Sequence, residues 1–155
     1  MEIQAGNIVS QIKRLSDRIF ERILAKQNID EFNGAQGRIL YVLWQEEHIS
    51  LKELADRTGL APTTLTSMTD RMEAAGLLRR VPDKSDRRKT LLALTEKARG
   101  LEKDYREVSA QMTGLFYAGF SEKEMEMCET LLLRIYANLK QYDGAFPAEK
   151  EKEKG

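Results

Sequence analysis

The stretch ISLKELADRTGLAPTTLTSMTDRMEAAGLLRRVPDKSDRRKTLLAL, residues 49–94, carries the signals that decide the fold. Ser50 followed three residues later by Glu53 is typical of a capping box and predicts the start of a helix. Gly59 ends that helix, because glycine tolerates positive φ at a helix C-terminus, and Pro62 suits the first turn of a second helix. Two short helices joined by a glycine-containing turn form a helix-turn-helix.

The second of these helices has a polar face that is rich in threonine. Threonine is a mediocre helix former, so its abundance here calls for a reason. Short hydroxyl side chains let a helix approach a phosphate backbone and base edges closely; the alternative is a polar surface without a function. We expect this exposed face to comprise Thr63, Thr64, Thr66, Ser67, Thr69, Asp70 and Arg71, opposite a buried stripe of Leu65, Met68 and Met72.

A cationic segment follows the helix-turn-helix. The eleven residues 79–89 include six Lys or Arg and two Asp. They lie between the apolar segments 77–78 and 91–94, and Pro82 and Asp83 supply turn chemistry, which predicts a β-hairpin with a cationic tip. A helix-turn-helix followed by a basic hairpin is the plan of a winged helix. Its second helix would enter the major groove, and the arginines of the wing would suit a narrow, electronegative groove.

Amphipathic helices are predicted on both sides of this segment, so the expected fold is mainly α with a small β-wing. Residues 8–24 place apolar side chains at alternating steps of four and three, and residues 34–47 form a second helix with a thick apolar side. A third long helical region is expected over about 95–118 and a last helix over about 121–142. The charged tail, 143–155, is predicted to be disordered.

The composition excludes several classes of function. The chain has 155 residues, which favours one domain, and its 25 Lys and Arg balance 25 Asp and Glu, so attraction for an anion must be local. One cysteine and one histidine leave little for catalysis or a tight metal site, and we expect neither an enzyme nor a cofactor. The sequence has no long apolar run and no apolar signal segment at its N-terminus, which makes a cytoplasmic location the default expectation, without a membrane.

The central segment contains a set of motifs that belong together: Asp70-Arg71-Met72-Glu73, Gly76-Leu77, Arg80, Asp83, Asp86-Arg87-Arg88, Leu94-Thr95 and Gly100. With these motifs the segment resembles the MarR family of bacterial transcription regulators. The resemblance implies a regulator, a repressor in our reading, that binds double-stranded DNA as a homodimer, each subunit reading half of a pseudo-palindromic operator. It also implies that residues 1–33 and 119–142 are dimerisation helices and that 34–118 hold the winged helix with a long linking helix.

The apolar stripes of the two terminal helices agree with a dimer, because such surface is hard to explain without a partner. The alternative is that both helices close one monomeric core. The expected dimer residues are Ile8, Ile12, Leu15, Ile19, Leu131, Leu132, Ile135 and Leu139.

The resemblance assigns roles to individual residues. Arg87 matches the arginine that enters the minor groove, oriented by Asp86, and Arg88 matches the arginine that pairs with the acid of the recognition helix, here Asp70. Ser67 departs from the pattern, since many relatives carry a long polar residue there, which leaves more to shape readout. The expected DNA-binding set is Thr63, Thr64, Thr66, Ser67, Arg71, Arg80, Lys84, Asp86, Arg87 and Arg88.

Relatives of this family commonly release DNA when a small molecule, often an aromatic acid or phenol, enters a cleft beside the winged helix. A small aromatic effector, or none, is therefore expected, and Cys128 is expected to be a buried structural thiol. A winged helix that binds a protein partner instead of DNA stays open as an alternative. The candidate effector residues, which could equally be core, are Phe32, Arg38, Tyr41, Trp44 and Tyr105.

Overall fold

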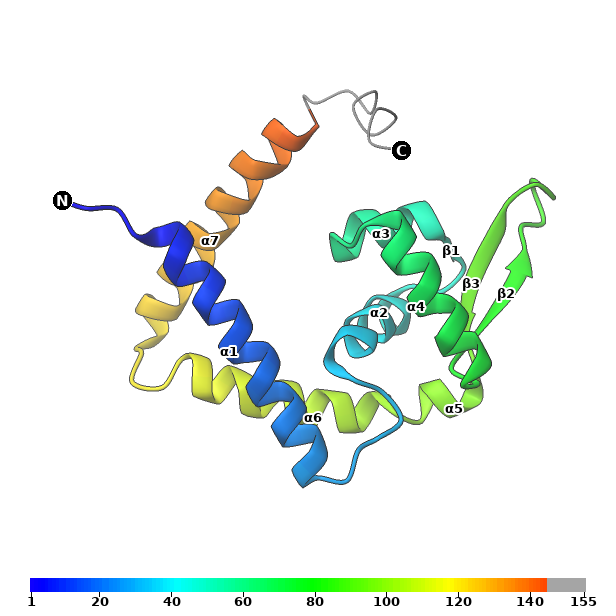
Figure 1. Ribbon diagram of the computed structural model, residues 1–155, viewed down its shortest axis with the longest axis horizontal. Helices are drawn as coiled ribbons and strands as arrows, with labels where there is room; N and C mark the ends of the chain where they lie inside the picture. Colours follow the sequence, from blue (N-terminus) through cyan, green and yellow to red (C-terminus); the bar gives the residue numbers. More distant parts are fainter. Residues whose placement is uncertain (145–155) are drawn as a thin grey trace. The chain divides into compact units, whose positions relative to one another are not determined.

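The computed structural model describes residues 1–144 and divides into two compact units, Met1–Thr113 and the residues from Gly114 onward. It is mainly helical with a small antiparallel sheet, as predicted (Figure 1). The assignment of residues 1–33 and 119–142 to dimerisation stays a prediction. The helices are α1 (Ala5–Lys26), α2 (Gly34–Gln45), α3 (Leu51–Thr58), α4 (Pro62–Ala74), α5 (Glu96–Arg99), α6 (Glu102–Phe116) and α7 (Glu122–Asp143), and the strands are β1 (Ile49–Ser50), β2 (Leu78–Pro82) and β3 (Thr90–Leu94).

The helix-turn-helix forms as the sequence predicts, with α3 and α4 in contact. The Ser50 hydroxyl accepts a hydrogen bond from the Glu53 amide at 3.1 Å. The Glu53 carboxylate does not complete the predicted capping box but accepts a bond from Arg57 at 3.0 Å. Gly59 has φ of +70°, which favours glycine, and Pro62 opens α4.

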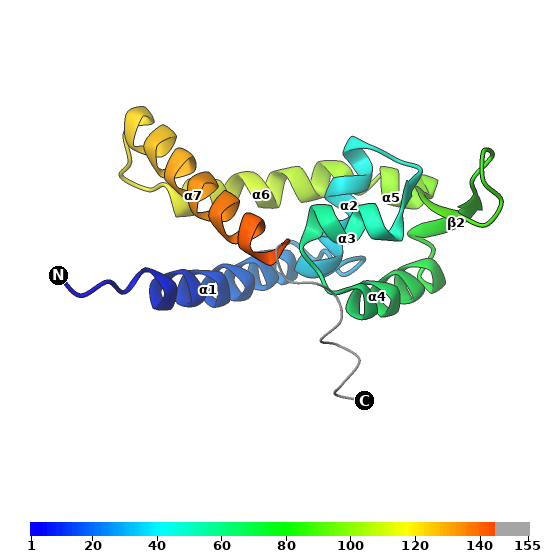
Figure 2. The same cartoon turned by 90° about the horizontal axis from the view of Figure 1, so that it is seen from above.

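The predicted hairpin is β2 and β3, and its tip projects beyond the helices of the first unit (Figure 2). The antiparallel register pairs Leu78 with Leu94 and Pro82 with Thr90. A third strand, β1, pairs with the other edge of β3 and was not expected from the sequence. A strand of two residues is too short to leave an alternating pattern.

One apolar core holds these elements at fixed positions. It is built from the inner faces of α2, α3 and α4, from the sheet and from α6, so the turn and the wing are anchored on buried side chains. Fully buried members include Ile39, Leu40, Leu43, Leu54, Leu65, Met72, Leu77 and Val108.

Two predicted helix boundaries are wrong. The helical region expected from residue 95 to 118 is broken: α5 ends at Arg99, and α6 begins at Glu102. Thr95 caps α5 as expected, with its hydroxyl 3.2 Å from the Ala98 amide. The second helix ends at Gln45 rather than Glu47, because Glu46 has an extended backbone, with φ of −153° and ψ of 113°. The Glu47 carboxylate accepts bonds from the Leu94 amide and from Arg99.

The second unit is dominated by α7. Ser121 and Glu124 form a complete capping box at its start, as predicted, and Gly119 before it has φ of +83°. The helix continues to Asp143, and residues 145–155 of the predicted disordered tail lie outside the described residues. Among residues 1–144, no helix is long and apolar enough to cross a lipid bilayer.

Candidate nucleic-acid interface

The outer face of α4 is polar and open to solvent. Thr63, Thr64 and Ser67 are exposed in its first two turns, followed by Arg71. Thr66 is also exposed, and its hydroxyl donates to the Pro62 carbonyl at 2.9 Å. Short side chains over two turns give this helix a smooth surface that a groove could approach closely.

Thr69 is not on this exposed face, which corrects the sequence prediction. Its side chain is fully buried, at 0% exposure, between Leu65 and Met72 on the inner stripe of α4. The hydroxyl is satisfied inside the helix, where it donates to the Leu65 carbonyl at 2.9 Å. Burial is tolerated because a buried hydroxyl with a partner avoids most of its desolvation cost.

Arg80 of β2 ties the wing to α4. Its guanidinium donates to Asp70 at 2.6 Å and to Glu73 at 2.8 Å, and also to the Thr69 hydroxyl at 3.3 Å. The Arg80 amide donates to the second Glu73 oxygen at 3.2 Å. Arg80 was expected among the DNA-contacting residues, but these bonds commit its charge to the two acids of α4.

The predicted ion pair between Asp70 and Arg88 is therefore wrong in this structure. Arg80 lies in the strand next to α4, whereas Arg88 follows the turn at the tip of the wing, and its side chain is 92% exposed. Asp86 accepts bonds from the Arg88 amide at 3.1 Å and from its Nε at 3.2 Å. Asp86 thus orients Arg88 and not Arg87, the arginine that it was expected to orient.

The wing tip is a closed, cationic turn. Backbone bonds of 3.0 Å join the Asp83 amide to the Lys89 carbonyl and the Lys89 amide to the Asp86 carbonyl. Hydrogen bonds from Arg88 hold the pKa of Asp86 below its usual value, and bonds from Ser85 do the same for Asp83. Lys84 and Arg87 are exposed and, within residues 1–144, have no ion pair, so their charge is available to a ligand.

The residues expected to bind an effector form an aromatic cluster around Tyr105 of α6. The ring centroids of Phe32, Tyr41 and Trp44 lie 6.1, 5.8 and 5.3 Å from that of Tyr105. Trp44 is anchored further by a bond from its Nε1 to the Ala98 carbonyl at 3.0 Å. These rings pack on one another, so most of the set behaves as core rather than as the lining of an open site.

Tyr41 also borders a shallow pocket of about 370 Å³ between α2 and α3. Arg38 and Arg57 stand at its rim. Both guanidinium groups already have partners: Arg38 binds Asp17, and Arg57 binds Glu46 and Glu53. An anionic ligand in this pocket would compete with those carboxylates for Arg38 and Arg57.

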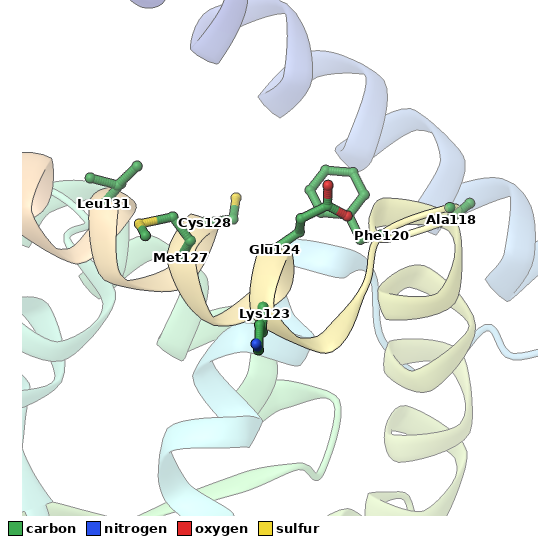
Figure 3. A pocket seen from close by; sticks show the side chains of 8 residues that line it. Ala118, Phe120, Lys123, Glu124, Met127, Cys128 and Leu131 are labelled. Carbon is green, nitrogen blue, oxygen red and sulfur yellow. The ribbon is translucent and has the colours of Figure 1, made fainter.

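Cys128 differs from the expected buried thiol. It is half-buried and opens on a pocket of about 660 Å³ in the second unit (Figure 3). Phe120, Met127 and Leu131 supply the apolar part of the lining, and Lys123 and Glu124 the polar part. Among residues 1–144, no cluster of three or more His, Cys, Asp or Glu side chains could hold a metal ion.

Both terminal helices expose apolar side chains. On α1 the exposed members are Ile8, Ile12 and Leu15, while Ile19 is half-buried. No residue of α7 is buried within the chain. The exposed apolar side chains of α7 include Leu131, Leu132, Ile135, Tyr136 and Leu139.

Comparisons with known proteins agree with this architecture. The model of the MarR family matches residues 32–90, which hold the helix-turn-helix and most of the wing. The chain is 40% identical over 85 residues to the HTH-type transcriptional regulator TtmR of Methylorubrum extorquens, an alignment that covers 55% of this chain and 42% of that protein. It is 32% identical over 110 residues to the HTH-type transcriptional regulator MhqR of Bacillus subtilis, covering 71% of this chain and 76% of that protein.

A solved structure with a similar fold contains DNA. It is a mutant of MarR from Escherichia coli in complex with operator DNA, with a TM-score of 0.76 at 22% identity. The similarity covers 86% of this chain and 94% of that one.

Proposed function

This chain belongs to the MarR family of DNA-binding transcription regulators, and from that premise we propose that it acts as a homodimeric repressor on a pseudo-palindromic operator. Two recognition helices related by a two-fold axis would read two half-sites, as in other helix-turn-helix dimers. Such a protein acts where the genomic DNA is, in the bacterial cytoplasm.

The observation that carries the proposal is the surface formed by α4 and the wing. Thr63, Thr64 and Ser67 offer a low, hydroxyl-bearing surface to the major groove, where they reach phosphates and base edges. Arg87 and Lys84 extend from the wing to the backbone and the neighbouring minor groove. The ion pairs of Arg80 with Asp70 and Glu73 support this role, because its positive charge offsets part of the negative charge on α4 that would repel phosphate.

The exposed apolar stripes of α1 and α7 support the homodimer. A helix of 22 residues without one buried side chain, such as α7, leaves a large apolar surface that monomeric proteins rarely expose. A second copy of the chain would cover this surface in a self-complementary interface.

Selection from a random duplex library, using the wild-type protein, tests the operator proposal. We expect enrichment of an inverted repeat whose half-sites are centred about one helical turn apart, roughly 10 base pairs, or a multiple of it. Enrichment of a single unrepeated half-site would contradict the dimeric reading. A protein that retains no duplex would favour the alternative, a winged helix that binds another protein.

Replacing Arg87 tests the wing. Arg87→Ala should weaken binding to the selected duplex by about 1–3 kcal/mol, roughly 5- to 150-fold in Kd, because the variant cannot reach into the groove at this position. Fluorescence anisotropy at fixed salt measures the change. Lys103→Ala is the matched control, since Lys103 is an exposed cation on α6, away from the wing. Equal affinity of Arg87→Ala and the wild type would rule out the wing assignment.

Our second proposal is that a small aromatic acid binds this chain and weakens its DNA binding, and the pocket beside Tyr41 supports it. Its volume of about 370 Å³ falls within the range of small-molecule sites. An acid bound there would displace a carboxylate that Arg38 or Arg57, at its rim, now binds. An aromatic acid that binds there should raise the melting temperature and weaken DNA binding, and Tyr41→Ala should abolish both effects. Stabilisation that persists in Tyr41→Ala would locate the ligand elsewhere.

A further inference from the structure

A row of cations runs along α1 without partners. Arg14, Arg18, Arg22 and Lys26 follow one another at four-residue steps, and all four are exposed. Within residues 1–144 none of them forms an ion pair, whereas Lys13 on the same helix is paired with Asp17 at 2.6 Å. Like charges at this spacing destabilise a helix, so the row has a cost in stability and calls for a function.

The row occupies a sector of α1 that nothing else in the first unit uses. Successive residues of a helix are rotated by about 100° around its axis. Viewed along that axis, the side chains of α1 fall into three sectors. One sector contacts α2, where Asp17 binds Arg38 and Glu21 accepts a bond from the Gly34 amide at 2.6 Å. A second is the free apolar stripe described above. Arg14, Arg18 and Arg22 lie between these two sectors. The row from Arg14 to Lys26 is about 18 Å long, at a rise of 1.5 Å per residue.

We propose that this row binds the phosphate backbone of double-stranded DNA and extends the contact surface beyond α4 and the wing. The inference rests on the proposed function, because it adds contacts to the same duplex. A small anion could neutralise one or two of these charges, but a row about 18 Å long matches a polyanion with regularly repeated charges, which the duplex backbone supplies.

A second copy of the chain fits the row less well. Of the five acids of α7, Glu124 is bonded to the Ser121 amide and Glu129 to the Tyr117 hydroxyl. Helical geometry puts Glu122 and Glu126 opposite the stripe formed by Leu131, Ile135 and Leu139, and the fifth acid, Asp143, is the last residue of the helix. An interface that buries this stripe turns Glu122 and Glu126 away from it, and Asp143 alone cannot balance the four cations of the row. Charge complementarity therefore favours DNA.

The test is the salt dependence of DNA binding by a triple variant, Arg14→Gln, Arg18→Gln and Arg22→Gln. Glutamine keeps a long side chain and has a similar helix propensity. Lys26 is left in place, because a cation in the last turn also stabilises the helix dipole. The matched control replaces Lys103, Lys123 and Arg134 by Gln, which removes the same charge from exposed positions on α6 and α7.

The slope of log K against log salt concentration changes by about 0.9 for each phosphate that the protein no longer neutralises. We therefore expect a slope shallower by about 2–3 for the triple variant, the same on selected and on random duplex, and an unchanged slope for the control. Circular dichroism checks that both variants remain helical.

A triple variant with the wild-type slope would overturn the inference while leaving the proposed function intact, provided that Arg87→Ala still weakens binding. A wild-type protein that binds no duplex would instead remove the proposed function. Loss of binding to phosphatidylserine vesicles in the triple variant, with DNA binding unchanged, would assign the row to a membrane surface and also overturn the inference.

Discussion

The environment of Asp70 explains how a DNA-binding helix can carry an acidic residue on its surface. The Arg80 guanidinium binds both Asp70 and Glu73, and its positive charge offsets one of their two negative charges, so α4 repels a phosphate backbone less. The side chains involved are largely exposed, and such pairs add little to stability. Their main effect is on charge and on the position of the wing relative to α4.

Arg80→Ala should therefore impair DNA binding more than folding. We expect a loss of about tenfold or more in affinity, because two unpaired acids then face phosphate, and a melting temperature close to that of the wild type. Adding Asp70→Asn to Arg80→Ala should restore part of the affinity. Arg79→Ala removes the same charge from an exposed position and is the control. An Arg80→Ala protein that binds as tightly as Arg79→Ala would refute this role.

Glu47 makes the fold dependent on pH. Burial by itself would raise the pKa of this carboxyl, but the Leu94 amide at 2.8 Å and Arg99 at 2.9 Å outweigh it, and the pKa is lowered. A carboxyl whose pKa is lower in the folded state stabilises the fold above its unfolded pKa. That contribution disappears as the pH falls through the folded value.

Glu47→Gln should accordingly reduce the free energy of unfolding by about 1–2 kcal/mol at pH 7, since the variant lacks a charged hydrogen-bond acceptor. The difference from the wild type should shrink as the pH falls below about 4.5, where the unfolded carboxyl is protonated. Urea denaturation of the wild type and the variant, at pH 7 and below about pH 4.5, measures this difference in the free energy of unfolding. Glu126→Gln, which changes an exposed glutamate, is the control. A difference that does not change with pH would contradict this explanation.

At the scale of elements, the sequence predicted most of what residues 49–94 form. Ser50, Gly59 and Pro62 act locally, at helix ends, so their meaning can be read without knowing the fold. The hairpin was predictable because apolar strands flank a charged turn, and the MarR family was recognised from the same segment.

Tertiary contacts account for what the sequence did not predict. The polarity of threonine predicts that Thr69 lies on the exposed face, but its hydroxyl bonds to its own helix and its side chain is fully buried. The partner of Asp70 depends on which residue of β2 lies beside α4, and this requires the packing of strand on helix. Glu73 was missed as a partner of Arg80 for the same reason.

The apolar stripe of α7 gives the sharpest test of an element. Ile135→Asp should weaken dimerisation by about 100-fold or more, because a carboxylate would be buried in the proposed interface. Leu133→Asp is the matched control: Leu133 is more exposed, at 63%, and helical geometry puts it on the opposite side of α7. Sedimentation velocity over a range of concentrations measures both. An Ile135→Asp protein that dimerises like the wild type would place the interface elsewhere.

The whole molecule is neutral, with 25 positive and 25 negative side chains, so its affinity for DNA depends on how charge is distributed. The wing concentrates cations at its tip, and Arg80 offsets part of the negative charge of Asp70 and Glu73 on α4. Binding to any duplex should consequently weaken as salt is raised, because counterions are released from the DNA.

The most direct measurement is the mass of the protein and of its complex with a selected duplex by sedimentation equilibrium in dilute salt. The account predicts a free protein of twice the 17.8 kDa of one chain, and a complex that contains two chains for each duplex. A free protein of 17.8 kDa that leaves the duplex unbound would contradict it.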